Sequence, residues 1–234
     1  MATTDPAQIL CYGDSNTWGL EALTFARFGA TVRWPGVLAA NMMDDGNYKV
    51  LEEGLSGRTT VWDDPLCSWL PPNDDPSVCN GRKSLMPILH SAKPVVAVVI
   101  ALGVNDLKAR FNLTPADIAS GVGMIVEKVQ QAQAGPDSSC PAILIICPPP
   151  CTNETFFPDI AGGIHKSLLL PAEYERVAKE KGCDVLDAGS VPGVVCSEED
   201  GVHLSKEAHA KLGVAIAEKL KVLLRPRGDG LRKT

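Results

Sequence analysis

Five short apolar segments constrain the fold of this chain more than any other feature of its sequence. They are rich in β-branched and aliphatic residues, and their apolar positions are mostly consecutive instead of alternating with polar ones. Continuous apolar runs of this length are typical of strands that are buried on both faces, as in a parallel sheet. The five segments span residues 8–12, 48–51, 95–102, 142–147 and 184–186.

Segments of helical character lie between these runs. Thr114 and Pro115 mark the start of one helix, because they supply a capping side chain and then a proline at the first helical position. Ser205 caps a second helix near the C-terminus, and apolar residues recur at helical spacing after both starts. Residues 168–181 also indicate a helix, which Pro171 must either start or kink.

The alternation of strands and helices predicts an α/β fold with parallel strands joined by right-handed crossovers. We expect a three-layer α/β/α sandwich around a flavodoxin-like, five-stranded parallel sheet of order 2-1-3-4-5. Residues 1–224 are predicted to form one domain, followed by a disordered tail at 225–234. The proline-rich stretches 62–86 and 148–163 are interpreted as long loops near strand ends, where α/β proteins place their ligand sites.

Charge and hydropathy exclude several classes of partner. The chain has 234 residues, 22 basic and 28 acidic side chains, and a formal net charge of -6. An acidic chain is not expected to bind nucleic acid or an anionic membrane surface. No apolar run approaches the ~20 residues of a membrane span. The first residues lack a basic region followed by an apolar stretch, so a cytoplasmic location is expected.

The eight cysteines are best interpreted as thiols without a chemical role. They form no C-x-x-C pair, and several lie in or beside the apolar runs, where cysteine behaves as a small hydrophobic residue. A disulfide between Cys67 and Cys79 and a metal site are the two alternatives. The sequence also lacks both G-x-x-x-x-G-K-[ST] and G-x-G-x-x-G, so no nucleotide cofactor is expected, and without a metal motif no metal is expected either.

A candidate nucleophile follows the first apolar run, in the segment GDSNTWG at residues 13–19. A serine in a tight turn beyond a buried strand exposes its hydroxyl and keeps its backbone N–H free of the sheet. Ser15 therefore has the surroundings that a nucleophile needs. The alternative is that Asp14 and Ser15 only make hydrogen bonds within the turn.

A candidate base lies far away in the sequence, just before the last helix. Asp200 and His203 are three residues apart in one short segment. Imidazole can take a proton from a serine, and a carboxylate fixes its tautomer and stabilises the imidazolium. The other three histidines are predicted to be solvated: His90, His165 and His209.

Two further strand ends carry polar segments, at residues 52–60 and 103–106. A tetrahedral intermediate needs hydrogen-bond donors for its oxyanion, and a glycine backbone or an asparagine amide can supply them. Each segment alone is more often a simple turn. However, the first three strands would be neighbours, so all three loops are expected to meet at one edge of the sheet.

Together these four segments resemble the SGNH hydrolase superfamily, also called GDSL-type esterases and lipases, and the likeness runs from residue 9 to about residue 224. Ser15 matches the nucleophile segment, Gly57 the glycine segment, Asn105 the G-x-N-D segment, and Asp200 with His203 the D-x-x-H segment. The likeness is greatest to the bacterial arylesterase/acyltransferase branch. Stretches around 33–38, 58–60 and 187–191 add to it.

The chain departs from that branch at three places. Val104 stands where a threonine is common, and Asn16 stands where a leucine can follow the nucleophile. The loop at 67–80 is particular to this chain. Pocket shape and oligomer contacts are therefore not carried over from the relatives.

The resemblance implies a Ser-His-Asp esterase that forms an acyl-enzyme, with an oxyanion hole made by Ser15, Gly57 and Asn105. Water or an alcohol would accept the acyl group, which makes acyl transfer possible beside hydrolysis. Short-chain esters are expected, because neither long loop resembles a large amphipathic lid. The predicted pocket residues are Asn16, Trp18, Trp34, Val104, Phe156 and Phe157.

Three alternatives to this function stay open. One is a carbohydrate O-acetyl esterase of the same superfamily, and another is a non-catalytic relative. A flavodoxin-like binding module would use the same sheet edge for a phosphate or nucleotide. Relatives in the acyltransferase branch assemble into oligomers, so a homo-oligomer is a further hypothesis.

Overall fold

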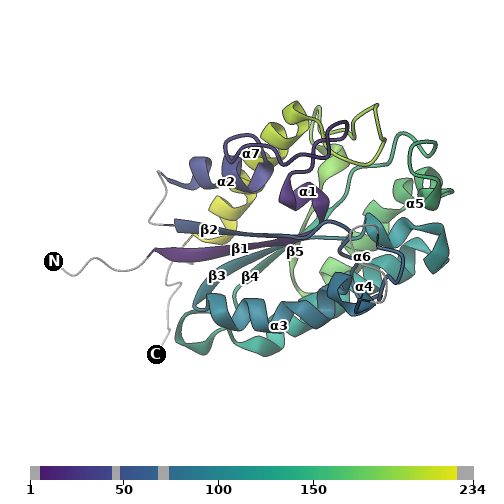
Figure 1. Ribbon diagram of the computed structural model, residues 1–234. Helices are drawn as coiled ribbons and strands as arrows, with labels where there is room; N and C mark the ends of the chain where they lie inside the picture. The colour runs from purple at the N-terminus through teal and green to yellow at the C-terminus, as the bar shows by residue number, and fades with distance from the viewer. Residues whose placement is uncertain (1–5, 44–47, 68–73, 226–234) are drawn as a thin grey trace.

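A parallel five-stranded sheet forms the centre of the protein in a computed structural model, which describes residues 6–43, 48–67 and 74–225 (Figure 1). The strand order is β2-β1-β3-β4-β5, which confirms the predicted topology. The strands are β1 (Ala7–Gly13), β2 (Tyr48–Gly54), β3 (Val95–Ala101), β4 (Ala142–Cys147) and β5 (Asp184–Asp187). The predicted tail, apart from Arg225, and the first five residues lie outside the described part of the chain.

The ends of the first three strands lie level with one another. Gly13, the last residue of β1, pairs with Gly54 on β2 and with Ala101 on β3. The segments that follow these strands therefore leave the sheet at one edge. β2 continues to Gly54 instead of ending at residue 51, because an edge strand that is only half buried keeps its ladder through polar residues.

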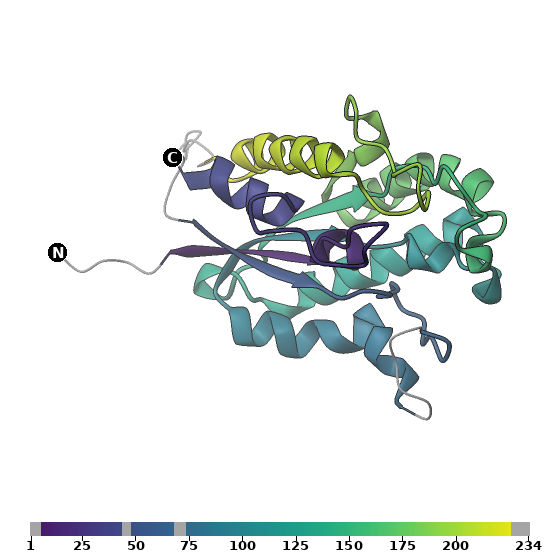
Figure 2. The same ribbon diagram turned by 45° about the horizontal axis from the view of Figure 1, so that its top comes forward.

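Helices cover both faces of the sheet and make the three layers (Figures 1 and 2). The α-helices are α1 (Ser15–Trp18), α2 (Trp34–Met42), α3 (Gly81–Ala92), α4 (Pro115–Ala132), α5 (Gly163–Leu168), α6 (Leu170–Lys181) and α7 (Lys206–Leu223). The short 3₁₀ segments are η2 (Pro76–Cys79), η3 (Asn105–Leu107), η4 (Ala109–Phe111), η5 (Pro136–Ser138), η6 (Pro158–Ile160) and η7 (Ala188–Ser190).

Alternate residues of β1 divide the core into two halves. Ile9 and Cys11 pack with the inner faces of α2 and α7. Leu10 and Tyr12 point to the other side and pack with α3, α4 and α6. Both faces of the strand are apolar because both are covered, which explains the continuous apolar runs.

The helix starts were predicted well where a capping pattern marks them. The Thr114 hydroxyl accepts from the Asp117 N–H at the start of α4, and the Ser205 hydroxyl caps α7. Residues 168–181 were expected as one helix, but α5 and α6 meet there, and Pro171 lies in the first turn of α6. Proline lacks an N–H and fits best in the first turn of a helix, where Pro171 lies.

The stretch 62–86 is also not a loop throughout. α3 begins at Gly81, where the Asn80 side chain accepts a hydrogen bond from the Lys83 N–H. Asn80 is therefore the N-cap of this helix. The prolines earlier in the stretch led to the prediction of a loop instead. Within the described ranges, no helix is both long and apolar enough to cross a membrane.

Candidate active site

The turn after β1 presents Ser15 at the edge of the sheet. Asp14 caps α1, and its carboxylate accepts a hydrogen bond of 3.0 Å from the Asn16 N–H. A side chain at Gly13 could not fit, because its Cβ would lie 1.9 Å from the Thr17 hydroxyl oxygen. The bare backbone at residue 13 therefore lets the chain turn at once into α1, which places the serine at the start of a helix.

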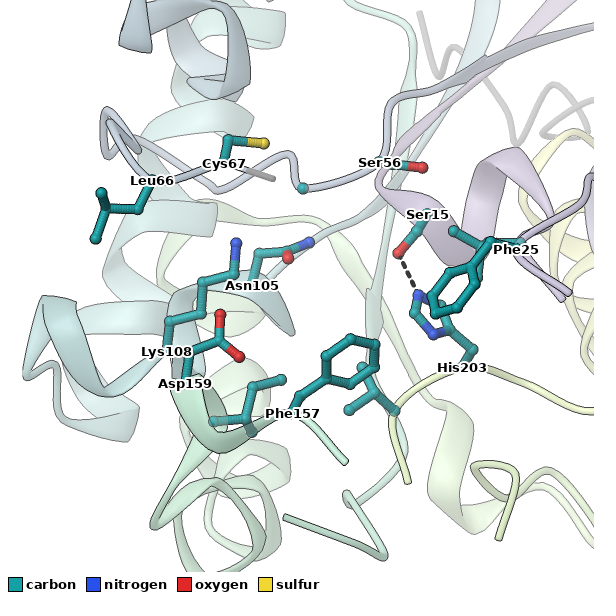
Figure 3. A pocket seen from close by; sticks show the side chains of 14 residues that line it. Ser15, Phe25, Ser56, Leu66, Cys67, Asn105, Lys108, Phe157, Asp159 and His203 are labelled. Atoms are coloured by element: carbon teal, nitrogen blue, oxygen red, sulfur yellow. Dashed lines mark hydrogen bonds between the residues drawn. The ribbon is translucent and has the colours of Figure 1, made fainter. Parts of the chain in front are cut away.

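His203 reaches this serine from the loop before α7. Its Nε2 lies 2.9 Å from the Ser15 Oγ, as the dashed line in Figure 3 shows. Its Nδ1 is hydrogen-bonded to Oδ2 of Asp200. The structure thus joins three side chains that are up to 188 positions apart in the sequence, in the order that proton transfer from a hydroxyl requires.

Asp200 is fully buried and held by its own loop. Its Oδ1 accepts from the N–H groups of Val202 and His203, each at 2.9 Å. Burial alone would raise the pKa of Asp200, but its hydrogen bonds with His203 and the charge of that ring hold the pKa below its ordinary value. An ionised Asp200 keeps the proton of His203 on Nδ1, which leaves Nε2 as the acceptor for the serine proton.

Asn16 links the turn after β1 to the loop that carries His203. Its Oδ1 accepts from the Leu204 N–H at 2.9 Å, and its Nδ2 donates to the Val202 carbonyl at 3.3 Å. These two backbone groups lie on either side of His203. A leucine at this position could make neither hydrogen bond, so this departure from the related branch fixes the loop that carries the histidine.

Gly57 and Asn105 line the same pocket as Ser15. Gly57 has a φ of +81°, a left-handed conformation that favours glycine. The Asn105 Nδ2 donates to the Arg58 carbonyl at 3.2 Å, and this holds the amide in place. An amide nitrogen carries two hydrogens, so a second one is available to an oxygen in the pocket.

Arg58 connects the ends of the first two strands, a role that the sequence pattern at residues 58–60 does not predict. Its guanidinium lies 4.2 Å from the centre of the Tyr12 ring and donates to the Gly13 carbonyl at 2.8 Å. It also donates to the Glu53 carbonyl. The side chain is buried, so these contacts fix the strand ends that carry the serine and the glycine.

Asp106 makes a similar connection between the loops after β2 and β3. Its carboxylate accepts from the Thr60 N–H at 3.0 Å and from the Thr60 hydroxyl. Burial raises its pKa to about 7, although the bonds from Thr60 act in the opposite direction. Burial likewise raises the pKa of Asp14 to about 6. Two buried carboxyl groups therefore lie beneath the site, each harder to ionise than an exposed one.

The pocket above Ser15 has a volume of about 200 Å³. Phe157 forms one wall, and its ring centre lies 6.0 Å from that of His203 (Figure 3). Phe156 packs on Phe157 with 4.9 Å between ring centres and does not itself line the pocket. Phe25, which the sequence did not single out, lines the mouth and lies 6.3 Å from Phe156.

The structure places the other expected pocket residues away from this lining. Trp34 and Asn16 border a separate cavity of about 30 Å³. Val104 is buried in the core, and Trp18 lies under the guanidinium of Arg27. Trp34 is almost fully buried because it starts α2 and packs against α7.

A charged cluster forms the part of the pocket away from His203 (Figure 3). Lys108 and Asp159 line it, and both bind to a shared network. The Lys108 Nζ lies 2.8 Å from Oδ2 of the buried Asp64. Arg110 joins Oδ1 of Asp64 and Oδ2 of Asp159, each at 2.7 Å. No spacing in the sequence links these four residues. The sequence predicted only that the long loops at 62–86 and 148–163 lie near strand ends.

His209 corrects the expectation of a solvated side chain. It is fully buried, its Nδ1 accepts from the Trp34 N–H at 3.3 Å, and burial lowers its pKa to about 4. It lies on the inner face of α7 against the core instead of facing solvent. His90 and His165 are exposed, as expected.

The cysteines lie mainly in the interior, and Cys140 is exposed. The sulfur atoms of Cys67 and Cys79 lie 2.8 Å apart, and both residues are buried. In the residues that the structure describes, no cluster of three or more histidine, cysteine or acidic side chains could hold a metal ion.

The fold and the matches to known families define the protein as an ester hydrolase. The model of the GDSL-like lipase/acylhydrolase family matches residues 11–211, and the chain belongs to this family. It is a carboxylic ester hydrolase. No curated protein is significantly similar to it in sequence.

Solved structures of bacterial esterases are similar along almost the whole chain. The aryl esterase of M. smegmatis is 36% identical, with a TM-score of 0.82, over 93% of this chain and 100% of that one. A carbohydrate acetylesterase from Sinorhizobium meliloti is 35% identical, with a TM-score of 0.81, over 93% and 99%. A lipase/acylhydrolase from Enterococcus faecalis, 19% identical with a TM-score of 0.66 over 94% of this chain and 98% of that one, shares the fold.

Proposed function

We propose that the protein cleaves short-chain carboxylic esters through an acyl-enzyme on Ser15. The observation that carries this proposal is the chain of contacts at the pocket floor. The Ser15 Oγ lies 2.9 Å from Nε2 of His203, and Asp200 is bonded to the opposite ring nitrogen. A hydroxyl, an imidazole and a buried carboxylate in this order are the groups that activate a serine.

In the first step His203 takes the proton of Ser15 while Oγ attacks the ester carbonyl carbon. The negative charge that develops on the carbonyl oxygen is stabilised by the N–H groups of Ser15 and Gly57 and by the Asn105 amide. The ring then donates its proton to the leaving alcohol as the C–O bond breaks. The acyl group stays on Ser15.

In the second step an acceptor attacks the acyl-enzyme, and His203 now removes the proton of that acceptor. With water the products are an acid and free enzyme, and with an alcohol the product is a new ester. The apolar wall of Phe157 and Phe25 beside His203 supports acyl transfer, since it gives an alcohol a surface to occupy.

Substrate size follows from the pocket. A volume of about 200 Å³ suits a small acyl or alcohol group better than a long fatty chain. Esters of small aromatic or aliphatic alcohols are therefore the first candidates, as for the relative from M. smegmatis, an aryl esterase.

A second candidate is the removal of acetyl groups from carbohydrates. The relative from Sinorhizobium meliloti is a carbohydrate acetylesterase. The charged side of the pocket at Lys108 and Asp159 supports this candidate, because sugars present many hydroxyl groups.

A panel of p-nitrophenyl esters with acyl chains of two to eight carbons tests the proposal. Turnover should be highest for the shortest chains, and added alcohol should divert part of the acyl group into a new ester. Ser15→Ala should lose all of this activity. If Ser15→Ala hydrolysed p-nitrophenyl acetate at the wild-type rate, the proposed nucleophile would be wrong.

We also propose an assembly state and a cellular location for the protein. A homo-oligomer is expected from the related branch, and light scattering that found only a 24.8 kDa species would refute it. A cytoplasmic location stays a prediction from the sequence.

A further inference from the structure

The charged side of the pocket has no part in the acyl-transfer steps, yet its members are joined by ion pairs. Asp64 is fully buried and Lys108 is 8% exposed. The Lys108 Nζ lies 2.8 Å from Oδ2 of Asp64. Burying an ammonium and a carboxylate is costly unless each is well paired. Apolar residues of similar size would close the same wall at less cost, so the position of these charges in the pocket needs a reason.

The cluster is balanced in charge. Lys108 and Arg110 are basic, and Asp64 and Asp159 are acidic. Burial would raise the pKa of Asp64, but Lys108 and Arg110 outweigh this effect and lower the pKa, so this carboxyl is ionised. A substrate anion would meet two carboxylates here, and a substrate cation would meet two basic groups.

The cluster still offers both donors and acceptors to the pocket. The Lys108 ammonium carries three hydrogens, and Asp64 accepts one of them. Arg110 binds Oδ2 of Asp159, and the carboxylate can accept further hydrogen bonds. Both Lys108 and Asp159 line the pocket, whereas Asp64 lies behind them. A donor and an acceptor in the lining of one pocket match hydroxyl groups, which both donate and accept.

We propose that Lys108 and Asp159 form a subsite for adjacent hydroxyl groups on the part of the ester that does not react, held in place by Asp64 and Arg110. This inference rests on the proposed esterase function and adds a substrate class to it. The preferred esters carry a diol on either the alcohol or the acyl side. Sites built to bind a hydroxyl discriminate strongly against an analogue that lacks it, because their polar groups are then left unpaired.

Two matched pairs of esters test this subsite. Glycerol 1-acetate and propyl acetate differ only in the hydroxyls of the alcohol, and ethyl glycerate and ethyl propanoate differ only in the hydroxyls of the acyl group. The measurement is the ratio of kcat/KM within each pair. In the wild-type protein we expect a preference of roughly ten- to hundredfold for the hydroxylated member of one pair, as for hydrogen bonds to charged groups.

Two variants assign that preference to the cluster. Lys108→Met keeps the length of the side chain and removes its charge, and Asp159→Ala removes the acceptor. Both should lower the preference at least several-fold. Asp159 is partly exposed, so its variant is expected to fold even if Lys108→Met does not. The matched control is Lys83→Met, which removes a lysine paired with Asp63 outside the pocket and should leave the ratio unchanged.

A wild-type protein with no preference in either pair would overturn the subsite. So would an Asp159→Ala variant that keeps the full preference. A wild-type protein that cleaves neither propyl acetate nor p-nitrophenyl acetate would instead refute the proposed function, and the subsite with it. The pair that shows the preference tells whether the diol belongs on the alcohol part or on the acyl part of the ester.

Discussion

The Nε2 atom of His203 lies 2.9 Å from the Oγ atom of Ser15, although the two residues are 188 positions apart in the chain. Each is held by its own local structure. Ser15 lies in a helix start capped by Asp14, and His203 lies in a loop that folds around the Asp200 carboxylate. Because both supports are local, a single variant can disturb one partner and leave the other in place.

Asp200→Asn should lower kcat by about 10⁴ with little change in the fold. The amide would donate a hydrogen bond to Nδ1, which favours the tautomer with its proton on Nε2 and leaves no acceptor for the Ser15 proton. Steady-state kinetics on p-nitrophenyl acetate measures the effect. Asp184→Asn is a matched control in a surface ion pair with Lys219, and its kcat should equal that of the wild type. An active Asp200→Asn variant would contradict the assigned role.

Asn105→Ala should lower kcat by roughly 10²–10³, as the loss of one oxyanion donor does in other serine hydrolases. KM should change much less, because the amide stabilises charge that develops only in the transition state. The same kinetics, with thermal unfolding to show that the fold is intact, separates the two quantities. A variant with reduced affinity and unchanged kcat would assign Asn105 to substrate binding instead.

Asn16→Leu should lower kcat by about tenfold and leave KM nearly unchanged. The variant loses the hydrogen bonds to Val202 and Leu204 that position the His203 loop. Neutral hydrogen bonds of this kind contribute about 1 kcal/mol each. A variant whose kcat is intact but whose melting temperature falls would show that Asn16 is only a structural residue.

Asp106→Asn should change how stability depends on pH. The folded state holds the Asp106 proton up to about pH 7, whereas an ordinary carboxyl releases it near 3.8. Between these values the folded state binds more protons than the unfolded state, so the free energy of unfolding falls as pH rises. The variant lacks this contribution. Urea unfolding from pH 4 to 8 should show a wild-type decline, on the order of a few kcal/mol, that is smaller in Asp106→Asn.

The comparison of the wild type with Asp106→Asn can also contradict the raised pKa of Asp106. Parallel stability curves for the wild type and Asp106→Asn over that range would show that the carboxyl group is already ionised in the fold. The bonds from Thr60 would then outweigh burial at this position.

Much of the fold could be predicted from local signals. Continuous apolar runs marked the strands, and Thr114 and Ser205 marked two helix starts, because capping acts within a few residues. The end of β2 could not be predicted, since an edge strand needs no apolar side chains to keep its ladder. The division into α5 and α6 depended on whether Pro171 starts or kinks a helix, and the sequence pattern fits both roles.

The candidate site was predictable where a short pattern carries it. Ser15, Asp200 and His203 lie in such patterns, and the structure brings them together. The direction in which a side chain points could not be predicted in the same way. Trp34 starts a helix whose inner face is covered, so it points into the core and not into the pocket. Lys108 and Asp64 meet across 44 positions without any pattern, so only the folded chain reveals the charged cluster.

Labelling with a fluorophosphonate probe tests the central claim most directly. The probe bonds covalently to an activated serine, and peptide mass spectrometry locates the modified residue. The wild-type protein should take up one probe on Ser15, Ser15→Ala should take up none, and Ser56→Ala, which changes another serine of the same pocket, should still be labelled. Label on Ser56, or equal labelling of Ser15→Ala and the wild type, would contradict the account.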